Sequence, residues 1–283
     1  MKIHRFIFIL ILLITTTISS YGQHSKSENP WFFIQITDPQ FGMFTNNANF
    51  EKETKLYEKA IESVNMLNPE FVIITGDFVH NQNSADQIKE FKRITSLINN
   101  SIPVYYTPGN HDIGQTPTKN SIKKYKKNYG SDRFSFMHKN SLFIGINSGL
   151  IKAGLEKQEA KQNKWLIRQL EKGKDANQVI VFCHYPFFNK SVDEPEAYSN
   201  IGPEARDKYL ALFDEYGVDA VFAGHYHNNA LNTFNGVELV TTSAVGKPLG
   251  KAPSGFRVVK VETDNTSHKY FGLEEMPKTL RVN

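Results

Sequence analysis

The chain has 283 residues, of which 40% are hydrophobic and 22% charged, so it can form a sizeable core and is not a disordered chain. The length is compatible with one large domain. The formal net charge of +4 is too small to indicate a nucleic-acid-binding surface. Cys183 is the only cysteine, which excludes an internal disulfide.

The first residues have the pattern of a secretory signal peptide. Lys2 and Arg5 precede an apolar run at residues 6–14, and small and polar residues follow as far as Gly22. This run is shorter than the ~20 residues that a transmembrane helix needs, which makes a membrane anchor the weaker alternative. We therefore predict a signal peptide over residues 1–22, export to the periplasm or the extracellular space, and a mature domain over residues 23–283 with no membrane span.

Short apolar runs bounded by turn residues recur along the chain, and such runs are typical of strands buried on both faces. Patterns with helical spacing separate most of them. The predicted strands are residues 31–36, 71–75, 104–107, 142–147, 179–183 and 220–223. The predicted helices are residues 56–67, 88–98, 158–170 and 205–216. This alternation of strand and helix indicates an α/β fold.

After residue 227 the pattern changes to apolar segments separated by turns. These segments are residues 230–234, 237–242, 256–261 and 268–271. Asn235-Gly236 is a strong hairpin signal, and we expect these strands to lie in a second sheet packed against the first. A basic cluster at residues 119–127 is interpreted as a solvated helix face, with attraction of an anionic substrate as the alternative.

Residues with metal-binding side chains stand immediately after several predicted strands. They are Asp38 with Gln40, Asp77, Asn110 with His111 and Asp112, His184, and His225 with His227. In open α/β sheets the carboxyl ends of the strands border the ligand crevice, so we expect these side chains to converge. His225 and His227 alternate on what we expect to be an extended segment, which would point both rings to the same side.

The types of side chain in this set indicate which ions it can bind. Besides His111, the set offers carboxylates, amide oxygens and imidazoles, a mixture that suits Mn²⁺, Zn²⁺ or Fe²⁺ better than Ca²⁺. Two such ions, about 3.5–4 Å apart, are commonly bridged by a carboxylate and by a water that their charge converts to hydroxide. Asp77 is the best candidate for the bridging carboxylate.

The order of the motifs resembles that of calcineurin-like metallophosphoesterases. The motifs are Asp38-x-Gln40, Gly76-Asp77, Gly109-Asn110-His111-Asp112, His184 and Gly224-His225-x-His227. The resemblance implies an α/β fold in which two mixed β-sheets, flanked by helices, form a four-layer αββα sandwich. It also implies two divalent metal ions. Asp38, Gln40, Asp77 and His227 would bind one ion, and Asp77, Asn110, His184 and His225 the other.

The resemblance also implies catalytic roles. His111 would approach the phosphate and protonate the leaving oxygen as general acid, and Asp112 would orient its imidazole. Asn110 and His111 would contact the substrate, a phosphate ester.

Gln40 departs from the family pattern, which usually has His at this position. Because an amide oxygen replaces an imidazole nitrogen, we expect weaker binding of softer ions. Among Mn²⁺, Fe²⁺, Zn²⁺ and Mg²⁺, this favours Mn²⁺. The stretch Asp38-Pro39-Gln40 is also similar to the subgroup of calcineurin-like phosphoesterase-domain serine/threonine protein phosphatases.

Three functions are compatible with the sequence. The first is a phosphomonoesterase that acts on a phosphoprotein or a small phosphate ester. The second is a phosphodiesterase for nucleotides or lipid head groups, which would differ in the loops at residues 113–131 and 187–203. The third is a metal-stabilised binding protein without activity, and the His111-Asp112 pair argues against it, since pure binding needs no positioned acid.

Overall fold

The computed structural model describes residues 29–263 and 265–280, so the signal peptide predicted over residues 1–22 lies outside the described residues. The strands are β1 (Trp31–Ile36), β2 (Val72–Thr75), β3 (Val104–Thr107), β4 (Phe134–His138), β5 (Ser141–Gly145), β6 (Val179–Phe182), β7 (Ala220–Ala223), β8 (Ala230–Phe234), β9 (Val237–Thr241), β10 (Gly255–Glu262) and β11 (Asn265–Gly272). The helices are α1 (Glu51–Leu67), α2 (Ala85–Thr95), α3 (Asn110–Ile113), α4 (Lys119–Tyr129), α5 (Ser148–Lys152), α6 (Glu156–Lys172) and α7 (Pro203–Glu215).

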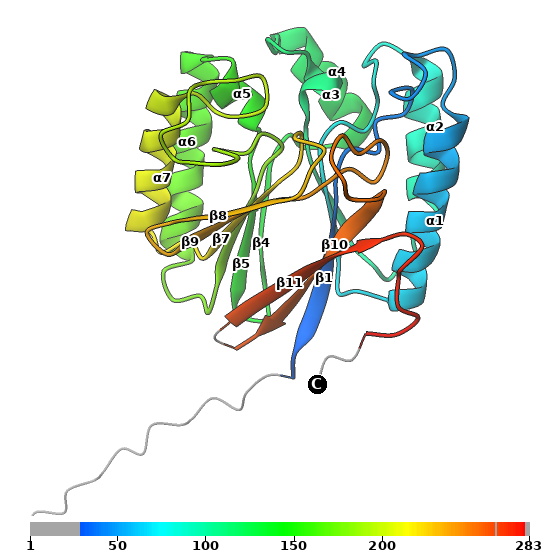
Figure 1. Ribbon diagram of the computed structural model, residues 1–283. Coiled ribbons are helices and arrows are strands. Elements are labelled where there is room, and N and C mark those ends of the chain that lie inside the picture. Colours follow the sequence, from blue (N-terminus) through cyan, green and yellow to red (C-terminus); the bar gives the residue numbers. More distant parts are fainter. Residues whose placement is uncertain (1–28, 264, 281–283) are drawn as a thin grey trace, which may run out of the picture.

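Two mixed sheets form the centre of the molecule (Figure 1). One has the strand order β11-β10-β1-β2-β3, with β1, β2 and β3 parallel and β10 and β11 antiparallel to their neighbours. The other has the order β4-β5-β6-β7-β9-β8, in which β5, β6, β7 and β9 are parallel. Its edge strands β4 and β8 are antiparallel to their neighbours.

Both sheets receive strands from the last third of the chain. The prediction that these strands form a second sheet of their own is wrong, because β10 pairs with β1, for example through Phe33 and Val259, and β9 pairs with β7. β8 and β9 extend the sheet of β5, β6 and β7. Each hairpin therefore covers one edge of a parallel sheet that would otherwise expose unpaired backbone groups.

Three apolar layers hold the sandwich together. Between the sheets, the ring of Phe33 on β1 lies 5.7 Å from that of Phe182 on β6 and 6.2 Å from that of Phe222 on β7. Because successive residues of a strand face opposite sides, Ile34 points outward and packs in the layer beneath α1 and α2. A third layer, which includes Phe213, lies beneath α6 and α7. The expected four-layer αββα arrangement is confirmed.

The basic cluster lies on a helix, as expected, since residues 119–127 fall within α4. Lys119, Lys123, Lys126 and Lys127 are exposed on it, and Lys126 forms an ion pair with the buried Asp132 at 2.8 Å. β4 was not predicted, because Ser135 interrupts its apolar residues, so they form no continuous run, and none of them is fully buried at the sheet edge.

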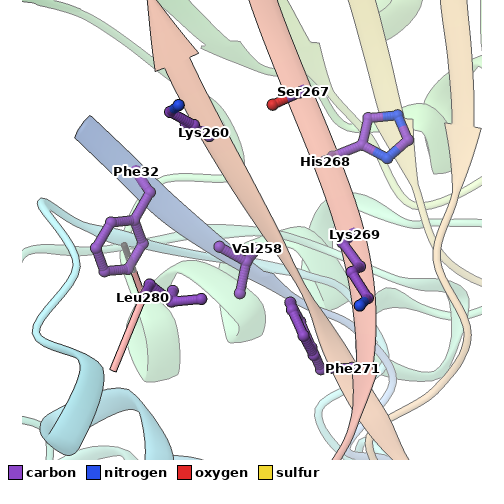
Figure 2. A pocket seen from close by; sticks show the side chains of 8 residues that line it. All are labelled: Phe32, Val258, Lys260, Ser267, His268, Lys269, Phe271 and Leu280. Carbon is purple, nitrogen blue, oxygen red and sulfur yellow. The ribbon is translucent and has the colours of Figure 1, made fainter. Parts of the chain in front are cut away.

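A hollow of about 200 Å³ lies beside β10 and β11 (Figure 2). Apolar side chains that include Phe32, Val258, Phe271 and Leu280 line much of it, and none of its lining residues is a predicted site residue.

Within the described residues, no helix combines the length and the apolar character that crossing a membrane requires.

Candidate metal centre

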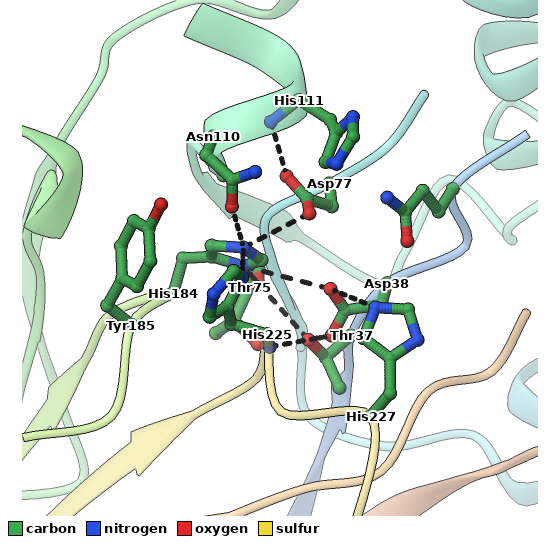
Figure 3. Close-up of polar contacts among 12 residues, drawn as sticks. Thr37, Asp38, Thr75, Asp77, Asn110, His111, His184, Tyr185, His225 and His227 are labelled. Carbon is green, nitrogen blue, oxygen red and sulfur yellow. Dashed lines mark hydrogen bonds and ion pairs between the residues drawn. The ribbon is translucent and has the colours of Figure 1, made fainter. Parts of the chain in front are cut away.

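Side chains from the carboxyl ends of strands in both sheets converge in one place (Figure 3). Asp38, Asp77 and Asn110 follow β1, β2 and β3, while His184 follows β6 and His225 and His227 follow β7. Each of these side chains has at most 5% of its surface exposed. The structure therefore brings the predicted ligands together in a buried cluster.

One ligand group surrounds the Nε2 atom of His184. This atom lies 3.3 Å from Asp77 Oδ2 and 3.1 Å from Asn110 Oδ1. His225 Nδ1 lies 3.1 Å from the same atom. These are the four residues that the family resemblance assigns to one ion.

The other ligand group consists of Asp38, Asp77 and His227, whose ligand atoms lie within 4.8 Å of one another. Asp38 Oδ1 is 3.3 Å from His227 Nε2. Gln40 is 2% exposed and follows the same strand as Asp38. Because Asp77 belongs to both groups, its carboxylate is positioned to bridge two ions.

A main-chain carbonyl fixes the tautomer of each imidazole in the two groups. The three contacts are His184 Nδ1 to Thr75 O at 2.9 Å, His225 Nε2 to Tyr198 O at 3.0 Å, and His227 Nδ1 to Lys247 O at 2.6 Å. Since a carbonyl oxygen can only accept, each of these ring nitrogens carries the hydrogen and donates it. The other nitrogen of each ring faces its ligand group, where it can offer a lone pair to a metal ion in place of a proton.

The residues fit two cations. Asp38 Oδ1 and Gln40 Oε1 are buried acceptor atoms that have no hydrogen-bond partner among the described residues. An acceptor left in this state costs about 1–3 kcal/mol, and converging lone pairs repel one another in addition. A divalent ion at each group removes both penalties, and the mixture of carboxylate, amide and imidazole donors suits Mn²⁺, Fe²⁺ or Zn²⁺.

The electrostatics of the two ligand groups favour positive charge at this place. Burial raises the pKa of Asp38 and Asp77, but His227 and His184 respectively outweigh it and hold both pKa values below the usual range. Burial and the neighbouring His184 lower the pKa of His225 to about 4, so its ring is neutral at pH 7. Burial lowers the pKa of His184, but Asp77 outweighs it and raises that pKa to about 9. The carboxylates therefore attract positive charge to this place.

The backbone is strained at the ligands. Asp38, Gln40, Asp77, His225 and His227 have φ angles of 53°, 39°, 48°, 64° and 51°, in the left-handed region that favours glycine. Such conformations cost on the order of 1–3 kcal/mol each and cluster at functional sites. The prediction of an extended segment at His225 and His227 is wrong, because both residues are left-handed and their rings serve different ligand groups.

Two motif glycines make room for the carboxylates. A Cβ atom on Gly224 would overlap Thr37 Oγ1 and lie 2.7 Å from Asp38 Oδ2, and one on Gly109 would overlap Asp77 Oδ1. The main-chain N–H of His225, which follows β7, also donates to Asp38 Oδ2 at 3.0 Å. Glycine therefore allows the main chain to approach the ligands closely.

His111 lies beside the two groups. Its main-chain N–H donates to Asp77 Oδ1 at 2.7 Å, and its ring Nδ1 lies 2.8 Å from His80 O. Asp112 instead accepts hydrogen bonds from the main-chain N–H groups of Phe78 and Gly109, each at 2.9 Å. The prediction that Asp112 orients the His111 imidazole is therefore wrong. Asp112 is the third residue of α3, so its carboxylate caps the start of that helix.

Sequence reasoning missed the groups that orient the imidazoles. Thr75, His80, Tyr198 and Lys247 act through main-chain carbonyls, which every residue type carries, so their side chains give no signal. The Tyr198 side chain is different, because its hydroxyl lies 3.2 Å from Asn110 Nδ2. Tyr198 belongs to the loop at residues 187–203, one of the two loops in which a phosphodiesterase would be expected to differ.

Comparisons with known proteins agree with this geometry. A family model described as Calcineurin-like phosphoesterase matches residues 33–229. The chain is 33% identical to the serine/threonine-protein phosphatase CPPED1 of Rattus norvegicus over 93% of this chain and 91% of the relative. It is also 33% identical to the Homo sapiens protein of that name, over 92% of this chain and 90% of the relative. These relatives confirm the subgroup that the Asp38-Pro39-Gln40 stretch indicated.

The fold has solved counterparts as well. A dimetal phosphatase from Danio rerio aligns with a TM-score of 0.63 and 14% identity over 86% of this chain and 96% of that one, which shows the shared fold. From the family match, the near full-length relatives and the two ligand groups, we conclude that the chain belongs to the calcineurin-like phosphoesterase family and is a metal-dependent phosphoester hydrolase.

Proposed function

We propose that this hydrolase is a phosphomonoesterase with two divalent metal ions in its active site. The observation that carries the proposal is that Asp77 is shared by two buried ligand groups. The near full-length similarity to proteins named serine/threonine-protein phosphatase supports monoesters as substrates. The substrates that we propose are phosphoserine or phosphothreonine in a protein, or a small phosphate monoester.

The ligands are proposed as two sets that share one residue. Asp38, Gln40, Asp77 and His227 hold one ion, and Asp77, Asn110, His184 and His225 hold the other. When bound, such ions polarise the phosphoryl group and lower the pKa of a water so that it can attack phosphorus. The lowered pKa values of Asp38 and Asp77 keep these carboxylates ionised, and contacts such as those to Thr75 O and Lys247 O orient the ligand rings.

His111 is the proposed general acid. Its Nδ1–H is held by His80 O, so Nε2 is the atom that carries the proton for the leaving oxygen. The bond from His111 N to Asp77 Oδ1 places the ring beside the shared carboxylate. Asn110 and His111 contact the substrate. Asp112 acts indirectly, by holding the main chain at Gly109 and Phe78.

Mn²⁺ is the proposed preferred ion, because Gln40 supplies an oxygen donor where the family usually has an imidazole. We also propose that the protein is exported and loses residues 1–22. The charged start and short apolar run of that segment support export. Edman sequencing of protein recovered outside the cytoplasm should begin near Gln23, and recovery of the full-length chain from the cytoplasm would contradict export.

The proposed reaction is tested by comparing p-nitrophenyl phosphate with bis(p-nitrophenyl) phosphate in the presence of Mn²⁺. We expect kcat/KM to favour the monoester by at least roughly tenfold, or ~1.4 kcal/mol. Asp77→Asn provides the control, since activity that survives this substitution belongs to a contaminant. A preference for the diester would make the protein a phosphodiesterase, and no turnover on a broad panel of phosphate esters would indicate a binding protein.

A further inference from the structure

The loop between β6 and α7 is anchored by a buried arginine. Arg206 of α7 has no exposed surface, and its guanidinium donates to main-chain carbonyls near both ends of the loop, Phe187 O and Ile201 O, each at 2.9 Å. It also donates to Val192 O and Glu194 O within the loop. A planar guanidinium that binds four carbonyls fixes the loop in one conformation.

This loop carries Tyr198 to the edge of the metal centre. Lys152 Nζ donates to Ala197 O at 2.7 Å, and the His225 ring donates to Tyr198 O at 3.0 Å. The main chain at Tyr198 is therefore tied to a predicted ligand. Its ring centroid lies 4.9 Å from that of His225, and 60% of the Tyr198 surface is exposed. The side chain thus covers the ligand group on one side and faces solvent on the other.

The Tyr198 hydroxyl accepts two hydrogen bonds. Asn110 Nδ2 lies 3.2 Å from it and Gln115 Nε2 lies 3.1 Å from it. The Gln115 amide is oriented by the Tyr185 hydroxyl, which donates to Gln115 Oε1 at 3.0 Å. Amide nitrogens only donate, so both contacts use lone pairs of the phenol oxygen. Neither amide nitrogen can accept the hydroxyl hydrogen. The Tyr198 O–H is therefore available to donate to another group at the edge of the site.

We propose that Tyr198 donates this hydrogen bond to a non-bridging phosphoryl oxygen of the substrate and thereby favours monoesters over diesters. The inference rests on the proposed phosphoesterase site. A monoester has three non-bridging oxygens and more negative charge, whereas a diester has two and carries a substituent in place of the third. A hydrogen bond to a charged acceptor is also stronger than one to a neutral group. Tyr198 is therefore a specificity-determining residue at this site.

Tyr198→Phe is the decisive variant, because it removes the hydroxyl and keeps the carbonyl that orients His225. In Mn²⁺-loaded protein, we expect the Kd of inorganic phosphate, measured by calorimetry, to rise about tenfold. The kcat/KM of an aryl monoester should fall by a similar factor, and that of the aryl diester by less than about threefold. Bound metal and the melting temperature should stay unchanged.

Two further variants separate a donor from a structural role. Tyr209→Phe is the matched control, since it removes a hydroxyl that donates to Glu159 Oε1 at 2.7 Å on α6. It should leave phosphate binding unchanged. Gln115→Ala should weaken phosphate binding in the natural protein and have no further effect in the Tyr198→Phe background, because Gln115 acts through the tyrosine hydroxyl.

An unchanged phosphate Kd in Tyr198→Phe would overturn the inference. Equal losses for monoester and diester, or a loss of bound metal, would also overturn it, because either result indicates a structural role. Phosphate binding requires no turnover, so it decides the role of Tyr198 even if the natural protein hydrolyses no monoester. Absence of monoester hydrolysis in the natural protein would count against the proposed function. It is measured without any Tyr198 variant, so the two failures can be distinguished.

Discussion

The imidazole of His111 is held by the main-chain carbonyl of His80, with 2.8 Å between Nδ1 and the carbonyl oxygen. The two rings also stack, with 4.7 Å between their centroids and 19° between their planes. In addition, Gln40 Nε2 lies 3.3 Å from His80 Nδ1, which turns Gln40 Oε1 away from His80. His80 therefore orients the proposed acid, His111, through its backbone carbonyl, and the proposed ligand, Gln40, through its side chain.

His111→Ala should abolish most turnover while the metal remains bound. The side chain is outside both ligand groups, so its removal takes away a proton donor and no ligand. We expect kcat to fall by at least roughly a hundredfold for an alkyl phosphate. The loss should be smaller for p-nitrophenyl phosphate, whose leaving group needs little protonation. Steady-state kinetics and metal analysis of the same preparation measure both effects.

His138→Ala is the matched control for this substitution. His138 lies on β4, and its Nε2 is 3.2 Å from Glu70 Oε2, outside the predicted site. Activity should therefore be preserved. Equal losses of activity for alkyl and aryl phosphates in His111→Ala would contradict the acid role.

Gln40→His should shift metal preference towards Zn²⁺. The substitution replaces an amide oxygen by an imidazole nitrogen at a buried position whose Oε1 has no hydrogen-bond partner among the described residues. Because imidazole suits Zn²⁺ and amide oxygen suits Mn²⁺, the ratio of Zn²⁺ to Mn²⁺ affinity should rise at least roughly tenfold. Competition titrations of the apoprotein measure this ratio, and an unchanged ratio would show that Gln40 is not a ligand.

The parts of the fold that follow from local pattern could be predicted. The predominantly apolar run at residues 31–36 coincides with β1, and the family motifs located the ligands. The partition of the strands between two sheets depends on long-range pairing, so the prediction missed that each sheet combines early strands with strands from the last third of the chain. The left-handed backbone at His225 and the carbonyl at His80 could not be predicted, because neither depends on a particular side-chain type.

Removing the metal should lower thermal stability. Ions that bind the folded state at about 100 times their Kd add about 2.7 kcal/mol, and a domain of this size gains about 2–4 °C in Tm per kcal/mol. Treatment with EDTA should therefore lower Tm by roughly 5–10 °C, and added Mn²⁺ should restore it. Asp77→Asn should lose most of this response, since Asp77 belongs to both groups. A Tm that changes with neither EDTA nor Mn²⁺ would contradict the proposal that the folded protein binds two metal ions.

Asp132 should contribute to stability in a pH-dependent way. Burial raises the pKa of Asp132, but Lys126 and Arg133 outweigh it and lower that pKa below its usual value. A lowered pKa in the folded state adds stability above the unfolded value of about 3.9, and this stability is lost as the pH falls through the folded value. Asp132→Asn should therefore lower Tm by roughly 2–4 °C at pH 7, as expected for loss of about 1 kcal/mol.

The difference in Tm between Asp132→Asn and the natural protein should shrink as the pH falls below about 4. Melting curves from pH 3 to pH 7 measure this trend. A difference that stays constant over the range would show that Asp132 acts through packing and not through its charge.

Gly224→Ala should remove one ion selectively. The added Cβ would overlap Thr37 Oγ1 and come within 2.7 Å of Asp38 Oδ2, so the Asp38 carboxylate must move. Asp38 belongs to the group with His227 and not to the group with His184 and His225. We therefore expect the number of bound Mn²⁺ ions to fall from two to one, with kcat/KM reduced by at least roughly a hundredfold.

Gly154→Ala separates the effect of this collision from backbone strain. Gly154 has φ of +60° and no atom within 4 Å of an added Cβ, so alanine there introduces strain without a clash. It should lower Tm slightly and leave two ions bound. If Gly224→Ala also retained two ions and full activity, close approach of the main chain at Gly224 would not be needed to hold Asp38 in place.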